Sequence, residues 1–170
     1  IMKTWLGVLR VITLVVLVLA VALGGVIVAV LRWSLPQTAG QITLPGLDST
    51  VEVLRDASGV PQIYADTPHD LFMAQGYVHA QDRLYQMDVW RHTTAGRLSE
   101  MFGEAALEDD RFLRTMGWRR VAEAEYAALD DESRALLDAY AAGVNAYLAG
   151  RSPLAVHNAY AVLALIGYQP

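Results

Sequence analysis

A run of 21 residues without a charged side chain constrains this chain more than any other feature. Residues 11–31, VITLVVLVLAVALGGVIVAVL, have Thr13 as their one polar side chain. At about 1.5 Å per residue, a helix of this length spans roughly 30 Å, the thickness of the hydrocarbon core of a bilayer. A secretory signal is the alternative, but its apolar region is usually about 7–15 residues long. The run here is longer and ends at Arg32 and Trp33, which favours an uncleaved transmembrane anchor.

The basic residues around this run predict its orientation. Lys3 and Arg10 precede it, whereas only Arg32 follows it closely. Positive charge favours the cytoplasmic side, so residues 1–33 are predicted to be a cytoplasmic N-terminus and a single-pass plasma-membrane anchor. The main domain would then be extracytoplasmic. Residues 34–47 contain two prolines and two glycines and are predicted to be a linker.

The charge balance and the absence of cysteine exclude several classes of function. Residues 1–47 hold three of the 13 basic residues and none of the 18 acidic ones, so the remainder is acidic. An acidic segment in a chain with one lysine argues against nucleic acid, where phosphate binding needs clustered cations. With no cysteine, the chain has no disulfide, thiolate metal site or cysteine nucleophile of its own.

From residue 48 on, the patterns predict an α+β segment that is mostly helical with one β-hairpin. Residues 51–55 and 60–65 have extended patterns on either side of the turn sequence DASG. Thr67 is predicted to cap a helix that ends near residues 92–95, before a glycine. Further helical stretches are predicted over residues 98–102, 108–116, 118–128 and from an Asp130 cap to just before Gly150. The apolar residues after 151 are expected to pack on another polypeptide or on further residues of the same protein.

The first of these long helices carries a polar cluster within about one and a half turns. His79 and Asp82 are three residues apart and could form a base and its orienting carboxylate, but such a pair needs a nucleophile within hydrogen-bond reach. No serine lies in the Gly-x-Ser-x-Gly setting of a nucleophile elbow. We therefore favour the interpretation that Gln81, Asp82 and Arg83 form a polar network that fixes this helix against a partner.

Other polar and aromatic residues have structural interpretations. His69 is expected at a helix start and His92 at a surface or a helix end, while His157 is uninformative. Four acidic residues lack the ligand spacing of a calcium loop and are expected to form a solvated face: Glu104, Glu108, Asp109 and Asp110. Seven aromatic residues are expected in the core: Tyr77, Tyr85, Trp90, Trp118, Tyr126, Tyr140 and Tyr147.

Five motifs follow one another along the chain, and the clearest is GYVHAQDRLYQM at residues 76–87. It is preceded by RDASGVPQI at 55–63 and followed by GRLSE at 96–100, AYAAGVNAY at 139–147 and IGYQP at 166–170. In this order the motifs resemble the penicillin acylase (penicillin amidase) family of N-terminal nucleophile hydrolases, which often has His at the place of Gln62. The resemblance runs from about residue 51 to residue 170, and residues 48–170 would be the N-terminal part of an acylase α subunit.

The resemblance implies a four-layer αββα fold and a precursor that cuts itself into a small α chain and a large β chain. The nucleophile, usually Ser, is then the first residue of the β chain, and its own amino group is the base. No catalytic residue and no metal ligand is therefore expected in this chain, although calcium is possible in the assembled enzyme. Tyr64 and Tyr77 are expected near the acyl pocket. Five residues are expected to be structural contacts between the α and β chains: His79, Gln81, Asp82, Arg83 and Arg97.

These inferences predict the membrane-anchored α subunit of an extracytoplasmic acylase that hydrolyses the amide bond of an N-acylated small molecule or lipid. Its partners would be the β subunit, the bilayer through residues 11–31, and the small substrate. The alternative is a catalytically inactive acylase-like domain that serves as an anchor or assembly partner in an envelope complex. A helical adaptor unrelated to acylases would require the motif matches to be coincidental.

Overall fold

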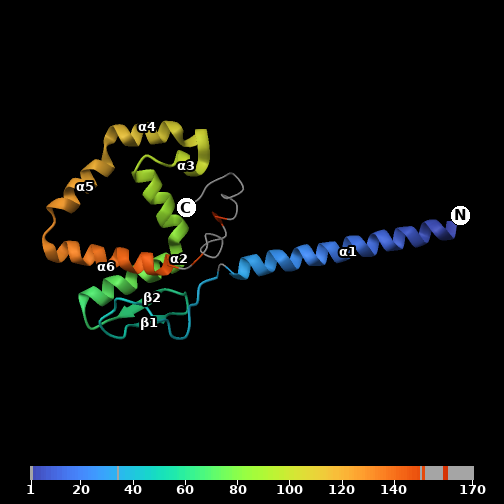
Figure 1. Cartoon of the computed structure of the whole chain (residues 1–170), viewed down its shortest axis with the longest axis horizontal. Coiled ribbons are helices and arrows are strands. Elements are labelled where there is room, and N and C mark those ends of the chain that lie inside the picture. The colour runs from blue at the N-terminus through green and yellow to red at the C-terminus, as the bar shows by residue number, and fades with distance from the viewer. Residues whose placement is uncertain (1, 34, 150, 152–158, 161–170) are drawn as a thin grey trace.

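A computed structural model describes residues 2–33, 35–149, 151 and 159–160 (Figure 1). The uncharged run lies in α1 (Met2–Trp33), a single long helix that extends away from the rest of the chain in Figure 1. Its residues 12–29 have a mean hydropathy of 3.0, and none of them is buried. The helix is long and apolar enough to cross a membrane. A signal sequence near the N-terminus would have the same length and composition, so these two properties do not distinguish an anchor from a signal. The predicted IGYQP motif and His157 lie outside the described residues.

The predicted hairpin is present and is antiparallel. β1 (Glu52–Arg55) pairs with β2 (Pro61–Tyr64), so that Arg55 lies opposite Pro61. One carboxylate organises the turn between them, because Asp56 Oδ1 accepts hydrogen bonds from the backbone N–H groups of Ser58 and Val60. Gly59 has a positive φ of 79°, a conformation that glycine adopts without a steric penalty.

Six helical elements follow the hairpin within residues 68–148. They are α2 (Pro68–Thr94), α3 (Ser99–Phe102), the 3₁₀ helix η1 (Gly103–Ala106), α4 (Leu107–Met116), α5 (Trp118–Ala128) and α6 (Asp131–Leu148). Several predicted ends are confirmed by their local chemistry. Thr67 Oγ1 accepts from the N–H of Asp70, Asp130 caps α6, and Gly117 ends α4 in the left-handed conformation. The 3₁₀ helix was not predicted.

The helices α2 and α6 form the centre of the fold. Figure 1 shows them side by side, with α4 and α5 arching from one end of α2 round to α6. The buried cluster lies mainly between α2, α3 and α6 and consists of Ala80, Leu84, Met101, Tyr147 and Tyr160. The helix α5 contributes no buried residue. Three of the seven aromatic residues expected in the core are therefore wrong, because Trp90, Trp118 and Tyr126 are 60%, 48% and 41% exposed.

Two glycines allow α2 and α6 to come into backbone contact. A Cβ on Gly76 would overlap the carbonyl oxygen of Tyr140, and one on Gly143 would overlap the carbonyl oxygen of Met73. Both glycines belong to the motifs noted in the sequence, and both are buried. Because the obstacle in each case is backbone, a side-chain adjustment cannot relieve the overlap, and the two helices would have to separate.

We expect Gly143→Ala to lower the melting temperature of the full-length protein, because overpacking at a close contact costs about 1–3 kcal/mol or more. The matched control is Gly24→Ala, whose new Cβ meets nothing within 4 Å. In an unobstructed helix this change is neutral or stabilises by about 0.5–1 kcal/mol. Equal melting temperatures for the Gly143 variant and the wild type would show that the helices are not held in contact there.

Candidate functional site

The polar cluster predicted from the sequence lies where α2 passes between the hairpin and α6. The helix is interrupted at this point, because Arg83 has non-helical backbone angles of φ −142° and ψ 22°. The residues on its N-terminal side face the hairpin and α6, and the residues after it begin a second helical segment. The kink was not predicted, since no proline or glycine marks it in the sequence.

One arginine of the hairpin clamps this part of α2. Arg55 Nη1 and Nη2 each donate to a different carboxylate oxygen of Asp82, and both distances are 2.9 Å. Nη2 also donates to Gln81 Oε1 at 2.9 Å, and Nη1 donates to the carbonyl oxygen of Gly59. The amide nitrogen of Gln81 donates in turn to the carbonyl oxygen of Gln37, in the predicted linker. A single guanidinium thus joins the hairpin to α2 with the two parallel hydrogen bonds typical of an arginine–carboxylate pair, and Gln81 connects this pair to the linker.

In this structure Asp82 and His79 have different partners, which favours the structural interpretation over a His79–Asp82 acid–base pair. Both oxygens of Asp82 are bound to Arg55, whereas His79 Nδ1 lies 3.0 Å from the hydroxyl oxygen of Tyr140 in α6. Burial raises the pKa of Tyr140 above its ordinary value, so the tyrosine stays protonated at neutral pH. The histidine therefore links α2 to α6, and the carboxylate links α2 to the hairpin.

A cavity of about 430 Å³ opens beside this cluster. Its walls come from the hairpin turn on one side and the kinked part of α2 on the other, and they consist of Ser58, Gly59, Val60, Pro61, His79, Asp82, Arg83, Tyr85 and Gln86. Arg83 is exposed, and its Nη1 donates to Gln86 Oε1 at 3.1 Å. The site therefore contains a cation that is held toward a cavity.

The two tyrosines predicted near an acyl pocket lie in different surroundings. Tyr64 is 54% exposed on β2, and its hydroxyl donates to Gln62 Oε1. Tyr77 is half-buried and packs edge-to-face on Tyr147, with 5.5 Å between the ring centroids. Neither residue lines the cavity beside Arg83 or the larger cavity of about 690 Å³ between α2 and α6. Their role in an acyl pocket stays a prediction.

Arg97, the fifth residue of the predicted contact set, belongs to a separate polar network beyond the end of α2. Its guanidinium donates twice to Glu100, at 2.7 and 2.6 Å, and this hydrogen bonding lowers the pKa of the Glu100 carboxyl. The chain turns sharply here, because Gly96 has a φ of 64°. Its carbonyl oxygen accepts from Arg114 Nε, which ties this turn to α4.

A buried carboxylate that the sequence did not predict completes this turn. Asp110 is 2% exposed and accepts from the backbone N–H groups of Leu98 and Ser99, at 2.7 and 2.8 Å. Burial acts to raise the pKa of Asp110, but the hydrogen bonds from Ser99 and Leu98 outweigh it and hold the pKa below its ordinary value. The expected solvated acidic face is therefore wrong at Asp110, because this residue binds the start of α3.

His92 was expected at a surface or a helix end; it lies in the last turn of α2, so the helix-end alternative is confirmed and the surface alternative is wrong. His92 is 3% exposed, and its Nδ1 lies 2.9 Å from the carbonyl oxygen of Asp88, one turn earlier. Asp88 is itself buried and accepts from Arg91 Nη2 at 2.6 Å and from the hydroxyl of Tyr160 at 3.0 Å. Asp88, Arg91 and His92 lie on one helix, but Tyr160 comes from a distant segment, and the helical pattern alone does not show that this segment packs over them.

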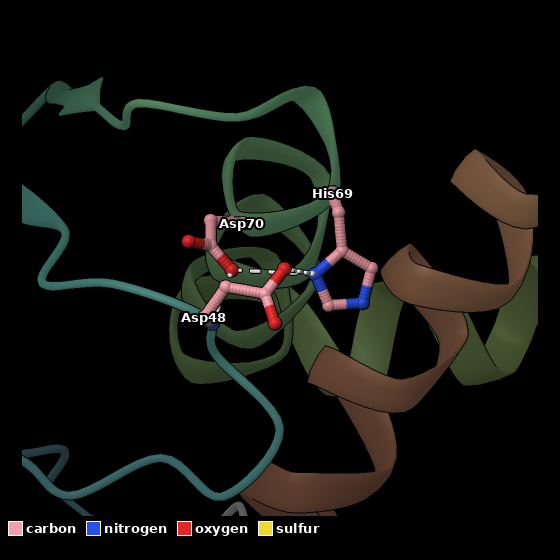
Figure 2. A group of neighbouring side chains, drawn as sticks. All are labelled: Asp48, His69 and Asp70. Atoms are coloured by element: carbon pink, nitrogen blue, oxygen red, sulfur yellow. Dashed lines mark hydrogen bonds and ion pairs between the residues drawn. The ribbon is translucent and has the colours of Figure 1, made fainter.

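A third group contains Asp48, His69 and Asp70, and one ligand atom from each could approach a common metal ion (Figure 2). The contacts of Asp70 account for the group without an ion. Asp70 is fully buried, and its oxygens accept from the N–H groups of Asp48 and Ser49 and from the hydroxyl of Ser49. His69 Nδ1 lies 3.2 Å from Asp70. The cluster therefore anchors the end of the predicted linker to the start of α2.

Comparisons with known proteins agree with this architecture. The family model described as "Penicillin amidase" matches residues 50–170. The chain is 40% identical to a protein named "Penicillin acylase 2 proenzyme" from Pseudomonas sp. (strain SE83), over 82% of this chain and 17% of that protein. It is 47% identical to "Acyl-homoserine lactone acylase QuiP" from Pseudomonas aeruginosa, over 68% of this chain and 14% of that protein.

A solved structure is similar as well. A thermostable penicillin G acylase from Alcaligenes faecalis superposes with a TM-score of 0.62 and 34% sequence identity, over 71% of this chain and 64% of that one. The chain thus belongs to the penicillin amidase family. It spans about one sixth of the length of the curated relatives described above.

We expect Arg55→Lys to lower the stability of the full-length protein, because lysine supplies one charge but loses the two-pronged geometry. The pair is about one-fifth to one-quarter exposed, with 18% and 27% for the two side chains. We therefore expect a loss of about 1 kcal/mol, between the values for surface and buried charged hydrogen bonds. Arg119→Lys is the control, since its partner Glu123 is 63% exposed. Equal shifts in melting temperature would contradict a special role for Arg55.

We also expect Asp70→Asn to alter the acid sensitivity of the fold. The backbone hydrogen bond from Asp48 is the main cause that lowers the pKa of Asp70 from 3.8 to about 2. A lowered pKa in the folded state adds stability that is complete above pH about 4 and is lost as the pH falls to about 2. The wild type should therefore melt at a higher temperature than the variant at pH 6, and this difference should shrink toward pH 2. A constant difference would contradict the assignment.

Proposed function

We propose that this chain is the α-subunit part of an extracytoplasmic acylase that hydrolyses the amide bond of an N-acylated small molecule. The family match over residues 50–170 carries this proposal. The similarity in three dimensions to a solved penicillin G acylase supports it independently of the sequence motifs. The two relatives are named for penicillin and for acyl-homoserine lactones, and removal of an acyl group is common to both names.

The side chains that the structure describes support a nucleophile outside this segment. Ser49 and Ser133 donate their hydroxyl hydrogens to Asp70 and Asp130, in contacts that anchor the starts of α2 and α6. Among the described residues, His79 contacts the hydroxyl of Tyr140, and His92 contacts backbone and carboxylate groups of Asp88 and Glu100. A hydroxyl nucleophile needs an adjacent base to attack an amide carbonyl. In our proposal it is the first residue of a β chain, released when the precursor cuts itself, and its own amino group is the base.

The reaction then proceeds in two steps. The nucleophile attacks the amide carbonyl, the negative charge on the carbonyl oxygen is stabilised by hydrogen-bond donors, and the amine leaves. Water releases the acyl group as a carboxylic acid. In this scheme the residues of the present chain hold the framework, with the Arg55 clamp and the close α2–α6 contact at Gly76 and Gly143 fixing the surface on which the β chain packs. Calcium remains a proposal for the assembled enzyme.

The proposal also includes a membrane anchor through residues 11–31, with the active site held outside the cytoplasm. A mean hydropathy of 3.0 over residues 12–29 and the position of the basic residues support it. A lipid-like N-acyl substrate would then meet the site close to the membrane surface. Extraction of membranes at alkaline pH distinguishes an uncleaved anchor from a cleaved secretory signal. An anchored protein stays in the membrane pellet, whereas a protein whose signal has been cleaved is released.

Maturation gives the direct test. The full-length precursor, tagged at its C-terminus and purified in detergent, should yield two polypeptides, one containing this chain and a larger one that begins with Ser, Thr or Cys. Replacing that first residue by Ala should leave the precursor uncut. A single uncut wild-type polypeptide, or a second one without a nucleophile at its first position, would contradict the catalytic proposal and favour the inactive domain. N-terminal sequencing and intact mass make both measurements.

A further inference from the structure

Arg83 stands apart from most arginines of the described chain. Arg91, Arg97, Arg111 and Arg119 each pair with a nearby acid: Asp88, Glu100, Glu108 and Glu123. By contrast, within the described residues Arg83 makes a side-chain hydrogen bond to the neutral Gln86 and no ion pair. The adjacent carboxylate of Asp82 is not available to it, because both of its oxygens bind Arg55.

The surroundings of Arg83 favour an anion. Arg55 neutralises Asp82, so Arg83 supplies the uncompensated charge of the cavity of about 430 Å³ that it lines. His79 lies in the same wall and adds ring nitrogens that can form hydrogen bonds. Arg83 Nη1 donates to Gln86 Oε1 at 3.1 Å, so the arginine side chain is already held in place. It therefore loses less conformational entropy when it pairs with an anion. A carboxylate can accept two parallel hydrogen bonds from such a guanidinium.

We propose that this cavity receives an Asp or Glu side chain of the β subunit, and that its carboxylate pairs with Arg83. The inference rests on the proposed function, because it requires a β subunit. It assigns a specific charged contact to the interface between the two subunits. The kink in α2 contributes to this contact, because the non-helical backbone at Arg83 places the residue in the cavity wall beside the hairpin turn.

Chemical cross-linking tests the contact in the full-length protein. The segment has one lysine, Lys3, which precedes the predicted anchor, so Arg83→Lys introduces a uniquely placed amine. A carbodiimide joins an amine to a carboxylate with which it is in contact. We expect a covalent α–β product, and mass spectrometry should find residue 83 joined to an Asp or Glu of the β chain. Arg120→Lys is the control, because Arg120 also lacks an acid partner among the described residues but does not line the cavity. No product, or an equal yield from the two variants, would overturn the inference.

A second measurement removes the charge. Arg83→Gln should weaken the association of the subunits about tenfold and reduce its dependence on salt, as expected for loss of a charge-assisted hydrogen bond. Arg120→Gln should leave both unchanged. If Arg83→Gln instead raised KM for a substrate that carries a carboxylate while assembly stayed normal, the cavity would be a substrate site and the inference would be wrong.

Measurements on the wild-type protein separate failure of the proposed function from failure of the Arg83 inference. A wild-type protein that yields no β chain contradicts both the proposed function and this inference. A wild type that matures and hydrolyses an N-acyl amide, together with an Arg83→Gln variant that assembles normally and an Arg83→Lys variant that forms no cross-link, contradicts this inference alone.

Discussion

The contact between α2 and α6 is the constraint on which the rest of the fold depends. Gly76 and Gly143 let the two backbones touch, and a methyl group at either position would overlap a carbonyl oxygen of the other helix. This approach brings Tyr140 within reach of His79 and lets Tyr147 pack on Tyr77. A closely packed interior transmits such a shift, so separation of the helices would also disturb the cluster around the kink.

Carboxylate side chains fix the segments that pack around these two helices. Three carboxylates each bind a different part of the chain to a helix: Asp70 holds the end of the linker, Asp82 holds the hairpin through Arg55, and Asp110 holds the start of α3. These groups are buried or partly buried, and each is paired with donors, as buried charges must be. In this arrangement the acids stabilise tertiary structure, and most large apolar side chains of α4 and α5 stay exposed, although Leu113 is buried. Phe112, Met116, Trp118 and Val121 are each about half exposed or more.

Local chemistry explains which features could be predicted from the sequence. The Thr67 and Asp130 caps, the Gly117 end and the hairpin turn depend on neighbouring residues, and the structure confirms them. The kink at Arg83 and the burial of Asp110 and His92 depend on segments far apart in the chain, which helical periodicity does not report. The position of the polar cluster was predicted, but its pairing was not, because the partner of Asp82 is 27 residues away on the hairpin. Residue chemistry alone did not explain why the polar cluster has no nucleophile beside it. The family motifs gave the explanation, because they place the nucleophile on a separate β chain.

The central claim is that this framework belongs to an amide hydrolase. Analysis of the products of an acyl-homoserine lactone, incubated with the full-length protein in detergent, tests it most directly. Cleavage of the amide releases equal amounts of a fatty acid and homoserine lactone with its ring intact, and the account predicts this outcome. Ring opening with the acyl group still attached, or the absence of any product from this and other N-acyl amides, would contradict it.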